Sequence, residues 1–257
     1  IQASDMPKPD LLSEVIARKS DDTGVLYTTD SISYKALAAS SEESNPVTYT
    51  LSIPKGETFR LVLSDGSEVY LNANSRLIYP KVFKKAERVV TLEGEGYFKI
   101  AHNSDKPFIV RCGALQVRVL GTEFNVYGYN SSSPVVTLVN GKVALDDTDG
   151  NHLDDMLPGQ NATLDADGKI RKENVDIESF LYWKEGYFYF DDVTLSDMMR
   201  EIGEWYNINV AFESKDIMNL RMHFFADRNK EVSDIIDQLN KMECIYAYIE
   251  NDCLLIK

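Results

Sequence analysis

The chain has 257 residues, of which 44% are hydrophobic, and a formal net charge of −14. This length suits one large or two ordinary domains, and this composition is that of a globular protein with a real core. Nucleic acid is not expected as a partner, because phosphate binding needs clustered Lys and Arg and the acidic sequence has no basic stripe.

The first 46 residues are polar and become Ser-rich toward their end. Leu11–Lys19 is a candidate short helix, and Val25–Tyr27 and Ile32–Tyr34 are candidate strands. The sequence contains no signal peptide before Ile1 and no run of 18 apolar residues, so no membrane-spanning helix is predicted. The opening residues resemble the interior of a longer protein.

From Val47 to about Leu164 the sequence has one uniform pattern of short alternating runs separated by turn signals. This pattern predicts an all-β sandwich, barrel or solenoid, and periodicity does not choose among them. Asn140-Gly141 is the strongest hairpin signal. The predicted strands outside the stretch described next are Tyr49–Ile53, Phe59–Leu63, Val69–Leu71, Leu77–Tyr79, Val89–Leu92, Val135–Val139 and Val143–Leu145.

The centre of this region is the stretch Gly94–Tyr129, which we expect to form part of the core. Its four apolar runs are bounded by Gly, Pro, Asn and Asp and contain no helical spacing. Such runs predict short, half-buried strands. The runs are Tyr97–Ile100, Phe108–Val110, Leu115–Leu120 and Phe124–Tyr129.

After about Ser179 the period changes to that of helices. Thr194 precedes a stripe with i, i+3, i+4, i+7 spacing that starts at Leu195, and Asn207 ends this helix. A second stripe runs from Val232 to Met242, and each stripe is flanked by short strand patterns. These predict two βαβ units with both helices on one face of a small sheet.

The sequence therefore predicts two domains. Residues 1–178 comprise the lead-in segment and a β-rich domain, solenoid-like or a sandwich of many short strands, and residues 179–257 comprise a small α+β domain of two βαβ units. A last strand, Cys253–Ile256, is expected to close a hairpin after Asn251-Asp252. In that hairpin Cys244 is out of register with Cys253, so no disulfide is expected between them.

No constellation of residues predicts catalysis, metal binding or cofactor binding. His102, His152 and His223 stand alone, and no Gly-x-Ser-x-Gly elbow or phosphate loop occurs. Asp146–Asp149 resembles the start of a calcium loop but lacks the closing glutamate, so it is interpreted as a solvated turn. We expect a protein that is not an enzyme and has no cofactor.

Trp205, Tyr206 and Phe212 are the candidate partner-binding residues. Exposed aromatic side chains often anchor protein interfaces. The alternative is that Trp205 belongs to the core, because it aligns with the stripe residue Met242 when the two units are superposed.

Several ordered motifs resemble those of FecR-type anti-sigma regulators, from about Gly24 to the end of the chain. Gly96 departs slightly, since alanine is usual there. The C-terminal motifs resemble those of Bacteroidetes members. The motifs are Leu63-Ser64-Asp65-Gly66-Ser67, Val69-Tyr70-Leu71-Asn72-Ala73-x-Ser75, Arg88-Val89-Val90, Gly94-Glu95-Gly96-Tyr97-Phe98, Lys106-Pro107-Phe108, Gly121-Thr122-x-Phe124-Asn125-Val126, Leu157-Pro158-Gly159-Gln160, Trp183-Lys184-x-Gly186 and Trp205-Tyr206-Asn207.

This resemblance implies a periplasmic sensor region, anchored in the inner membrane by a helix that this chain does not contain. Such regions receive a signal from the signalling domain of a TonB-dependent outer-membrane transporter. A cytoplasmic segment, also absent here, holds an extracytoplasmic-function sigma factor. The resemblance further implies a solenoid-like β region and a C-terminal module similar to the short domain of secretins and TonB receptors.

The alternative function is a carbohydrate- or small-molecule-binding β domain without catalysis. A closed barrel with a deep apolar cavity would favour that alternative. A filled β region with free sheet edges would favour protein partners.

Overall fold

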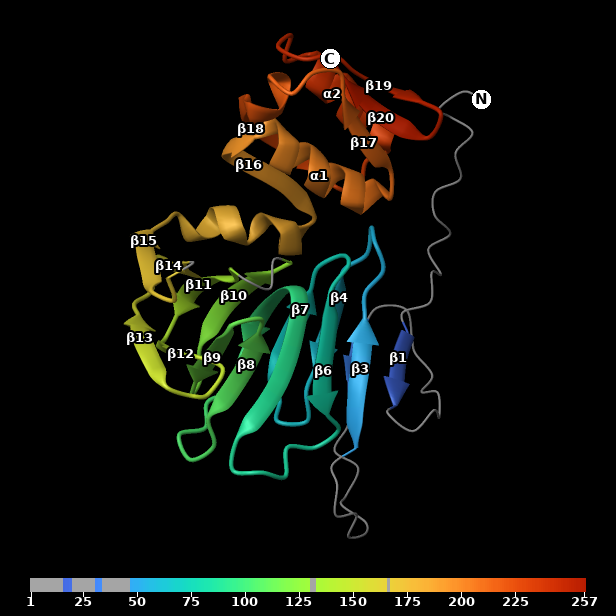
Figure 1. Cartoon of the computed structure of the whole chain (residues 1–257). Coiled ribbons are helices and arrows are strands. Elements are labelled where there is room, and N and C mark those ends of the chain that lie inside the picture. Colours follow the sequence, from blue (N-terminus) through green and yellow to red (C-terminus); the bar gives the residue numbers. More distant parts are fainter. Residues whose placement is uncertain (1–15, 20–30, 34–46, 130–132, 166) are drawn as a thin grey trace. The chain divides into compact units, whose positions relative to one another are not determined.

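The computed structural model describes residues 16–19, 31–33, 47–129, 133–165 and 167–257 (Figure 1). It separates into two compact units. The β-rich unit contains Thr58–Phe180 together with the strands that precede it, and the C-terminal unit contains Leu181–Lys257. Within the described residues, no helix combines the length and apolarity that crossing a bilayer requires.

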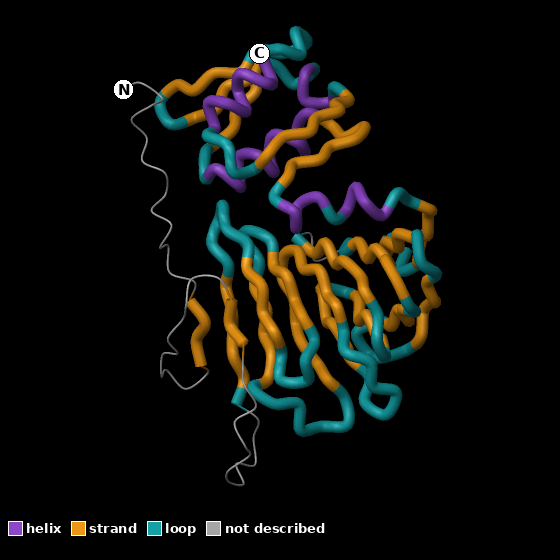
Figure 2. The backbone as a smooth tube through the Cα atoms, turned by 180° about the vertical axis from the view of Figure 1, so that it is seen from behind, coloured by secondary structure: helices purple, strands orange, loops and turns teal. Residues whose placement is uncertain are grey.

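The β-rich unit consists of short strands, as the alternating pattern predicts (Figure 2). Its strands are β1 Ile16–Lys19, β2 Ser31–Ser33, β3 Thr48–Ser52, β4 Phe59–Val62, β5 Glu68–Leu71, β6 Arg76–Pro80, β7 Arg88–Lys99, β8 Phe108–Cys112, β9 Leu115–Val119, β10 Glu123–Gly128, β11 Val135–Asn140, β12 Val143–Asp146, β13 His152–Met156, β14 Gln160–Leu164 and β15 Ile170–Asn174. A 3₁₀ turn, η2 Ile177–Phe180, ends the unit.

These strands form two layers that share one strand. The first layer has the order β1-β3-β6-β7-β8-β9-β12-β13. The second has the order β2-β4-β5-β7-β10-β11-β14-β15. After β3 the chain crosses repeatedly from one layer to the other, so sequence neighbours often lie in different layers (Figure 1).

Strand β7 belongs to both layers because it bends near Gly94. Its residues Arg88–Thr91 pair with β8 of the first layer, and Gly96–Lys99 pair with β5 of the second. Gly94 has φ 93°, and a Cβ there would lie 2.8 Å or less from atoms of Ser75. Only glycine fits this bend without displacing Ser75.

This continuous strand corrects one prediction. The sequence pattern predicts two separate strands, one ending at Leu92 and the next starting at Tyr97. The structure instead runs β7 through Gly94-Glu95-Gly96, whose glycines permit a bend within the strand in place of a turn.

A second correction concerns Asn140-Gly141. This turn does not close a hairpin, because β11 pairs with β10 and β14 whereas β12 pairs with β9 and β13. The turn carries the chain from the second layer to the first. The Thr122 hydroxyl donates to the carbonyl of Lys142 at 2.8 Å and fixes this crossing.

The space between the layers is filled by side chains. Leu51, Leu77 and Val110 of the first layer and Phe98 and Phe124 of the second have no exposed surface or almost none, and they belong to one continuous core. The rings of Phe98 and Phe124 stack with centroids 5.2 Å apart. These side chains pack between the layers at the density of a protein core.

Polar residues of the motifs hold this core together at two buried points. At the first, the Arg88 guanidinium, whose side chain is 2% exposed, donates to Asp65 Oδ2 at 2.7 Å and to the carbonyls of Ala101 and Lys106 at 2.8 Å. At the second, Glu95 accepts from the Asn72 amide at 2.7 Å and from the Asn125 amide at 2.9 Å. Each buried charge therefore has polar partners, as stability requires.

The C-terminal unit contains two helices and two small sheets. The first sheet pairs β16 Tyr187–Thr194 with β18 Arg221–Asp227, and the second has the order β17 Asn209–Phe212, β20 Cys253–Ile256, β19 Ala247–Glu250. The helices are α1 Leu195–Tyr206 and α2 Val232–Asn240, and the 3₁₀ turns are η3 Tyr182–Glu185 and η4 Ile217–Asn219.

The predicted single sheet under two helices is therefore wrong. The first strands of the two βαβ units pair with each other, and the second strands lie on either side of β20. Helix α1 packs against β16, β18 and β17, so it contacts both sheets. Its stripe Leu195, Met198, Met199 and Ile202 has 0% exposure and is buried in the core of the C-terminal unit.

Local signals set the helix ends. The backbone N–H of Asp197 donates to Thr194 Oγ1 at 3.1 Å, which confirms the predicted N-cap. Asn207, with φ 51°, forms the left-handed C-cap of α1. Helix α2 ends before Met242, since the Asn240 side chain bonds the backbone N–H and carbonyl of Ala247 and turns the chain toward β19.

Of the lead-in predictions, the helix Leu11–Lys19 is wrong in its last four residues, which form strand β1. The strand Ile32–Tyr34 overlaps β2. The strand Val25–Tyr27 lies outside the described residues. Cys112, Cys244 and Cys253 are free thiols, and Glu250 pairs with Cys253 across the final hairpin, as predicted.

The domain boundary can be tested by limited proteolysis. We expect the first cleavages between residues 175 and 186, where the short turns η2 and η3 are largely half-exposed, or before Val47. Gly94–Tyr129 is expected to resist, because strands β7 to β10 lie inside the two layers. Mass spectrometry of the early fragments checks this result, and a first cut within Gly94–Tyr129 would contradict the division.

Candidate partner-docking surface

The candidate site is the outer face of the β16–β18 sheet in the C-terminal unit. Successive side chains of a strand point to opposite faces. In β16, Phe188 and Phe190 are buried, whereas Tyr187 and Tyr189 are half-buried. In β18, Phe224 is buried and Phe225 is 53% exposed.

The outward rings form one cluster around Phe225, which we call the aromatic face. Phe225 stacks on Tyr187 with centroids 5.1 Å apart and meets Tyr182 of η3 edge-on at 5.5 Å and Tyr189 at 6.4 Å. Tyr182 also contacts Tyr189 at 4.7 Å. Rings that support one another in this way present a rigid apolar surface, which favours binding at a low cost in conformational entropy.

One ion pair and one histidine–carboxylate contact border the aromatic face on the same two strands. Arg221 Nε donates to Asp192 Oδ1 at 2.8 Å, and this hydrogen bond lowers the pKa of Asp192. His223 Nδ1 lies 2.5 Å from Asp191 Oδ1. An apolar centre with a polar, solvated rim is the usual anatomy of a protein–protein interface.

The C-terminal unit also has free strand edges. In the described structure β16 and β18 pair only with each other, and β17 and β19 each pair only with β20. The outer backbone groups of such edge strands can accept a partner strand.

The predicted site residues Trp205 and Tyr206 lie elsewhere and have internal partners. Trp205 Nε1 donates to the carbonyl of Arg228 at 3.0 Å, and the Tyr206 hydroxyl donates to the carbonyl of Lys230 at 2.8 Å. The Arg228 guanidinium lies over the Trp205 ring at 5.0 Å and over Phe188 at 4.6 Å. Burial is the main cause that raises the pKa of Tyr206.

Phe212 is half-buried on the edge strand β17 and packs against the core of the C-terminal unit. The structure therefore does not gather Trp205, Tyr206 and Phe212 on one exposed patch. Their role in partner binding stays a prediction. The internal contacts of Trp205 favour the alternative that this side chain stabilises the fold.

Sequence reasoning missed the aromatic face. The run Tyr187-Phe188-Tyr189-Phe190 is aromatic throughout, so hydrophobicity does not distinguish its two faces. The available signal was the alternation of Tyr with Phe, since a tyrosine keeps a polar hydroxyl that suits an exposed position.

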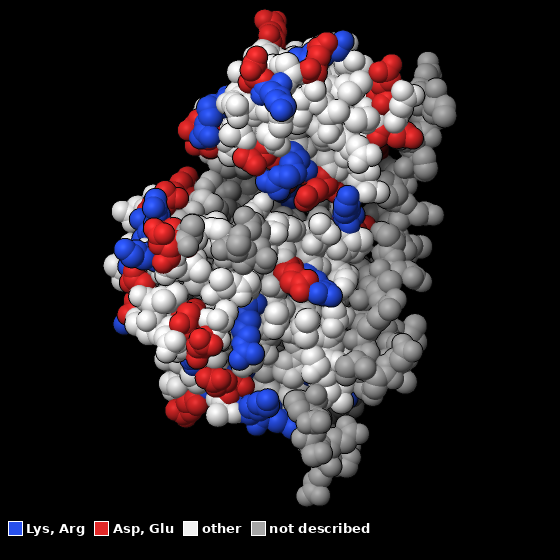
Figure 3. Space-filling view, viewed as in Figure 1, with Lys and Arg blue, Asp and Glu red and all other residues white. Residues whose placement is uncertain are grey.

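Charges on the surface are mixed. In the view of Figure 3, Lys and Arg are interspersed with Asp and Glu, without a large basic patch. In the described parts of the chain, no group of three or more His, Cys, Asp or Glu side chains is placed to hold a metal ion.

Comparison with known proteins assigns both units. The protein-family model described as "FecR protein" matches residues 49–144. The family model described as "FecR, C-terminal" matches residues 187–256. None of the curated proteins compared with the chain matches it.

Two crystal structures, at 1.65 Å and 2.50 Å, are of a candidate anti-sigma factor from Parabacteroides distasonis ATCC 8503. Each is 27% identical to this chain and superposes on it with a TM-score of 0.72. The aligned region includes 81% of this chain and 98% of the crystallised chain. With both family domains present in order, and a fold shared over most of its length, the chain belongs to the FecR family of anti-sigma regulators.

Proposed function

We propose that this chain is the periplasmic sensor part of a membrane-anchored anti-sigma regulator. In this role it receives a signal from the signalling domain of a TonB-dependent outer-membrane transporter. It relays that signal to an extracytoplasmic-function sigma factor, which a segment outside this chain would hold. The two FecR domains and the similarity to the candidate anti-sigma factor support the regulatory role.

The aromatic face is the observation that carries the docking step. It consists of four clustered rings, with the 53%-exposed Phe225 at the centre and the Arg221–Asp192 ion pair at the rim. We propose that the transporter's signalling domain covers this face. The free edges of β16 and β18 lie in the same sheet, so a partner strand could add main-chain hydrogen bonds beside the aromatic contacts.

The filled interior of the β-rich unit supports a protein partner over the alternative function. Side chains such as Leu61, Val69, Phe98 and Val126 occupy the space between its layers and have no exposed surface. These side chains occupy the volume in which a carbohydrate or other small molecule would have to bind between the layers.

Binding of the purified transporter signalling domain to the whole chain tests this proposal by titration calorimetry. The Phe225→Ala variant is expected to bind more weakly by about 2 kcal/mol, roughly 30-fold in the dissociation constant, because truncation of a central aromatic anchor usually has this effect. The matched control is Tyr246→Ala. Tyr246 is 58% exposed and contacts Tyr248, away from the aromatic face.

The control is expected to leave the dissociation constant within about threefold of the unmodified chain. Equal affinities for the Phe225→Ala and Tyr246→Ala variants would remove the aromatic face from the proposal. Full binding by a chain that lacks residues 181–257 would overturn docking on the C-terminal unit altogether.

A further inference from the structure

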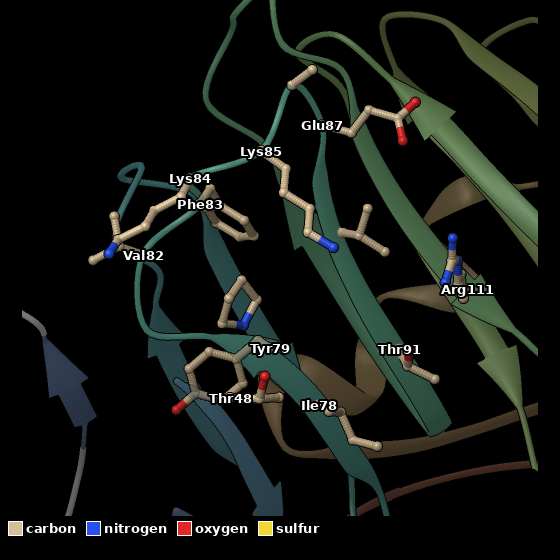
Figure 4. A pocket seen from close by; sticks show the side chains of 13 residues that line it. Thr48, Ile78, Tyr79, Val82, Phe83, Lys84, Lys85, Glu87, Thr91 and Arg111 are labelled. Carbon is tan, nitrogen blue, oxygen red and sulfur yellow. The ribbon is translucent and has the colours of Figure 1, made fainter. Parts of the chain in front are cut away.

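The β-rich unit has a hollow on the outer side of its first layer, distinct from the filled interior. The hollow has a volume of about 520 Å³ and lies between the loop 81–87 and the outward faces of β6, β7 and β8 (Figure 4). Ile78 of β6, Val89 and Thr91 of β7 and Phe83 of the loop all line it. This volume is within the range of small-molecule sites.

Three cationic side chains and one carboxylate line the hollow. Lys84, Lys85 and Arg111 are exposed, and in the described structure they have no ion-pair or hydrogen-bond partner for their side chains. Figure 4 shows Lys85 extending from the loop and Arg111 rising from β8 on the other side of the hollow. Such a group of unpaired cations stands out in a chain of net charge −14.

The single carboxylate is already neutralised. Glu87 Oε1 accepts from Arg118 Nη1 at 2.8 Å, outside the group of three cations. The unpaired charges that line the hollow are therefore all positive, which favours an anion there.

The Phe83 side of the hollow is held in place before any ligand arrives. Lys106 Nζ donates to the carbonyl of Phe83 at 2.6 Å, and the Phe83 ring meets the buried Phe108 edge-on with centroids 5.8 Å apart. A pre-formed site lowers the ordering cost of binding.

We propose that this hollow binds a small amphipathic anion, with its apolar body on Ile78, Val89 and Phe83 and its carboxylate, sulfonate or phosphate between Lys85 and Arg111. An extended peptide fits less well. The lining strands β6, β7 and β8 each pair with a strand on both sides, so they offer no free backbone edge to a peptide. The site lies in the β-rich unit and does not depend on docking at the aromatic face.

Decanoate, kept below its micelle-forming concentration, is a suitable probe with the whole chain. Titration calorimetry and NMR shifts of tyrosine and lysine signals report the binding. Decyltrimethylammonium carries the same apolar chain with the opposite charge, and inorganic phosphate carries charge without a chain. We expect decanoate to bind at least tenfold more tightly than either, and its affinity to fall as ionic strength rises.

The double variant Lys85→Glu, Arg111→Glu is expected to lose decanoate affinity by tenfold or more. Lys169→Glu is the matched control, because Lys169 is an exposed lysine in the turn between β14 and β15 and does not line the hollow. It is expected to bind like the unmodified chain. Both proteins should melt at the temperature of the unmodified chain, since the substituted side chains are exposed.

Three results would overturn the assignment. They are no detectable binding of decanoate at millimolar concentration, equal binding of decanoate and decyltrimethylammonium, or an unchanged affinity in the Lys85→Glu, Arg111→Glu variant. Tighter binding of an acidic hexapeptide than of decanoate would replace the small anion with a peptide.

Discussion

Replacing Arg88 with methionine is expected to lower the free energy of unfolding of the β-rich unit by about 3–5 kcal/mol, because it leaves one partner of a buried ion pair without the other. Methionine fills much of the same volume, so the loss is mainly polar. Asp65 would lose its ion pair, and the carbonyls of Ala101 and Lys106 would lose their donor. Urea unfolding followed by far-ultraviolet circular dichroism measures the change.

Arg60→Met is the matched control for this experiment. Arg60 also pairs with a carboxylate, Glu68, at 2.8 Å, but its side chain is 45% exposed. Exposed pairs contribute at most about 1 kcal/mol, so this variant is expected to differ little from the unmodified chain. Equal losses in the two variants would show that burial of Arg88 does not decide its contribution.

The two tryptophans allow the units to be followed separately. Trp183 and Trp205 are the only tryptophans of the chain, and both lie in the C-terminal unit. Tryptophan fluorescence therefore reports unfolding of that unit, and the Arg88→Met variant is expected to leave the fluorescence transition in place if the units unfold independently.

Replacing Trp205 with alanine is expected to lower the free energy of unfolding of the C-terminal unit by about 3 kcal/mol, since it removes a large packed ring. The ring contacts Phe188 edge-on at 6.2 Å and covers the guanidinium of Arg228, which is 4% exposed. The loss of the Nε1 donor also weakens the contact with the Arg228 carbonyl. The fluorescence of the remaining Trp183 during urea unfolding measures the effect.

Phe225→Ala is expected to have the opposite effect to Trp205→Ala, weakening partner binding more than stability. Its exposed ring contributes about 1 kcal/mol through its aromatic neighbours, so stability changes little while partner binding weakens. Trp205→Phe, which keeps an aromatic ring but lacks the N–H, is expected to recover part of the stability. A Trp205→Ala variant that keeps its full stability and loses partner binding would restore Trp205 as an interface anchor.

The positions of strands and helices are predicted well from the sequence, because each depends on a local periodicity of apolar residues. Alternation identifies the strands of the β-rich unit, and the stripes that begin at Leu195 and Val232 identify α1 and α2. Pairing between strands is a long-range property. Nothing near Asn140-Gly141 shows that the flanking strands pair with β9 and β10 and not with each other.

The candidate site was harder to predict than the fold. Trp205 and Phe225 are both large aromatic residues, and only their neighbours in space distinguish them. Trp205 finds a carbonyl and a guanidinium from the segment around Arg228, whereas Phe225 finds only the rings of other outward side chains. The cationic hollow was missed for the same reason, because Arg111 and Lys85 lie far apart in the sequence.

The shared strand β7 also governs how the β-rich unit opens. Its first half is hydrogen-bonded between β6 and β8, and its second half between β5 and β10. Unfolding of β7 would break hydrogen bonds to both layers at once. We therefore expect the two layers to unfold together and not as separate cooperative units. The amide protons of β7 are therefore expected to exchange with solvent only when the whole β-rich unit unfolds, which would make this strand the slowest-exchanging segment of that unit.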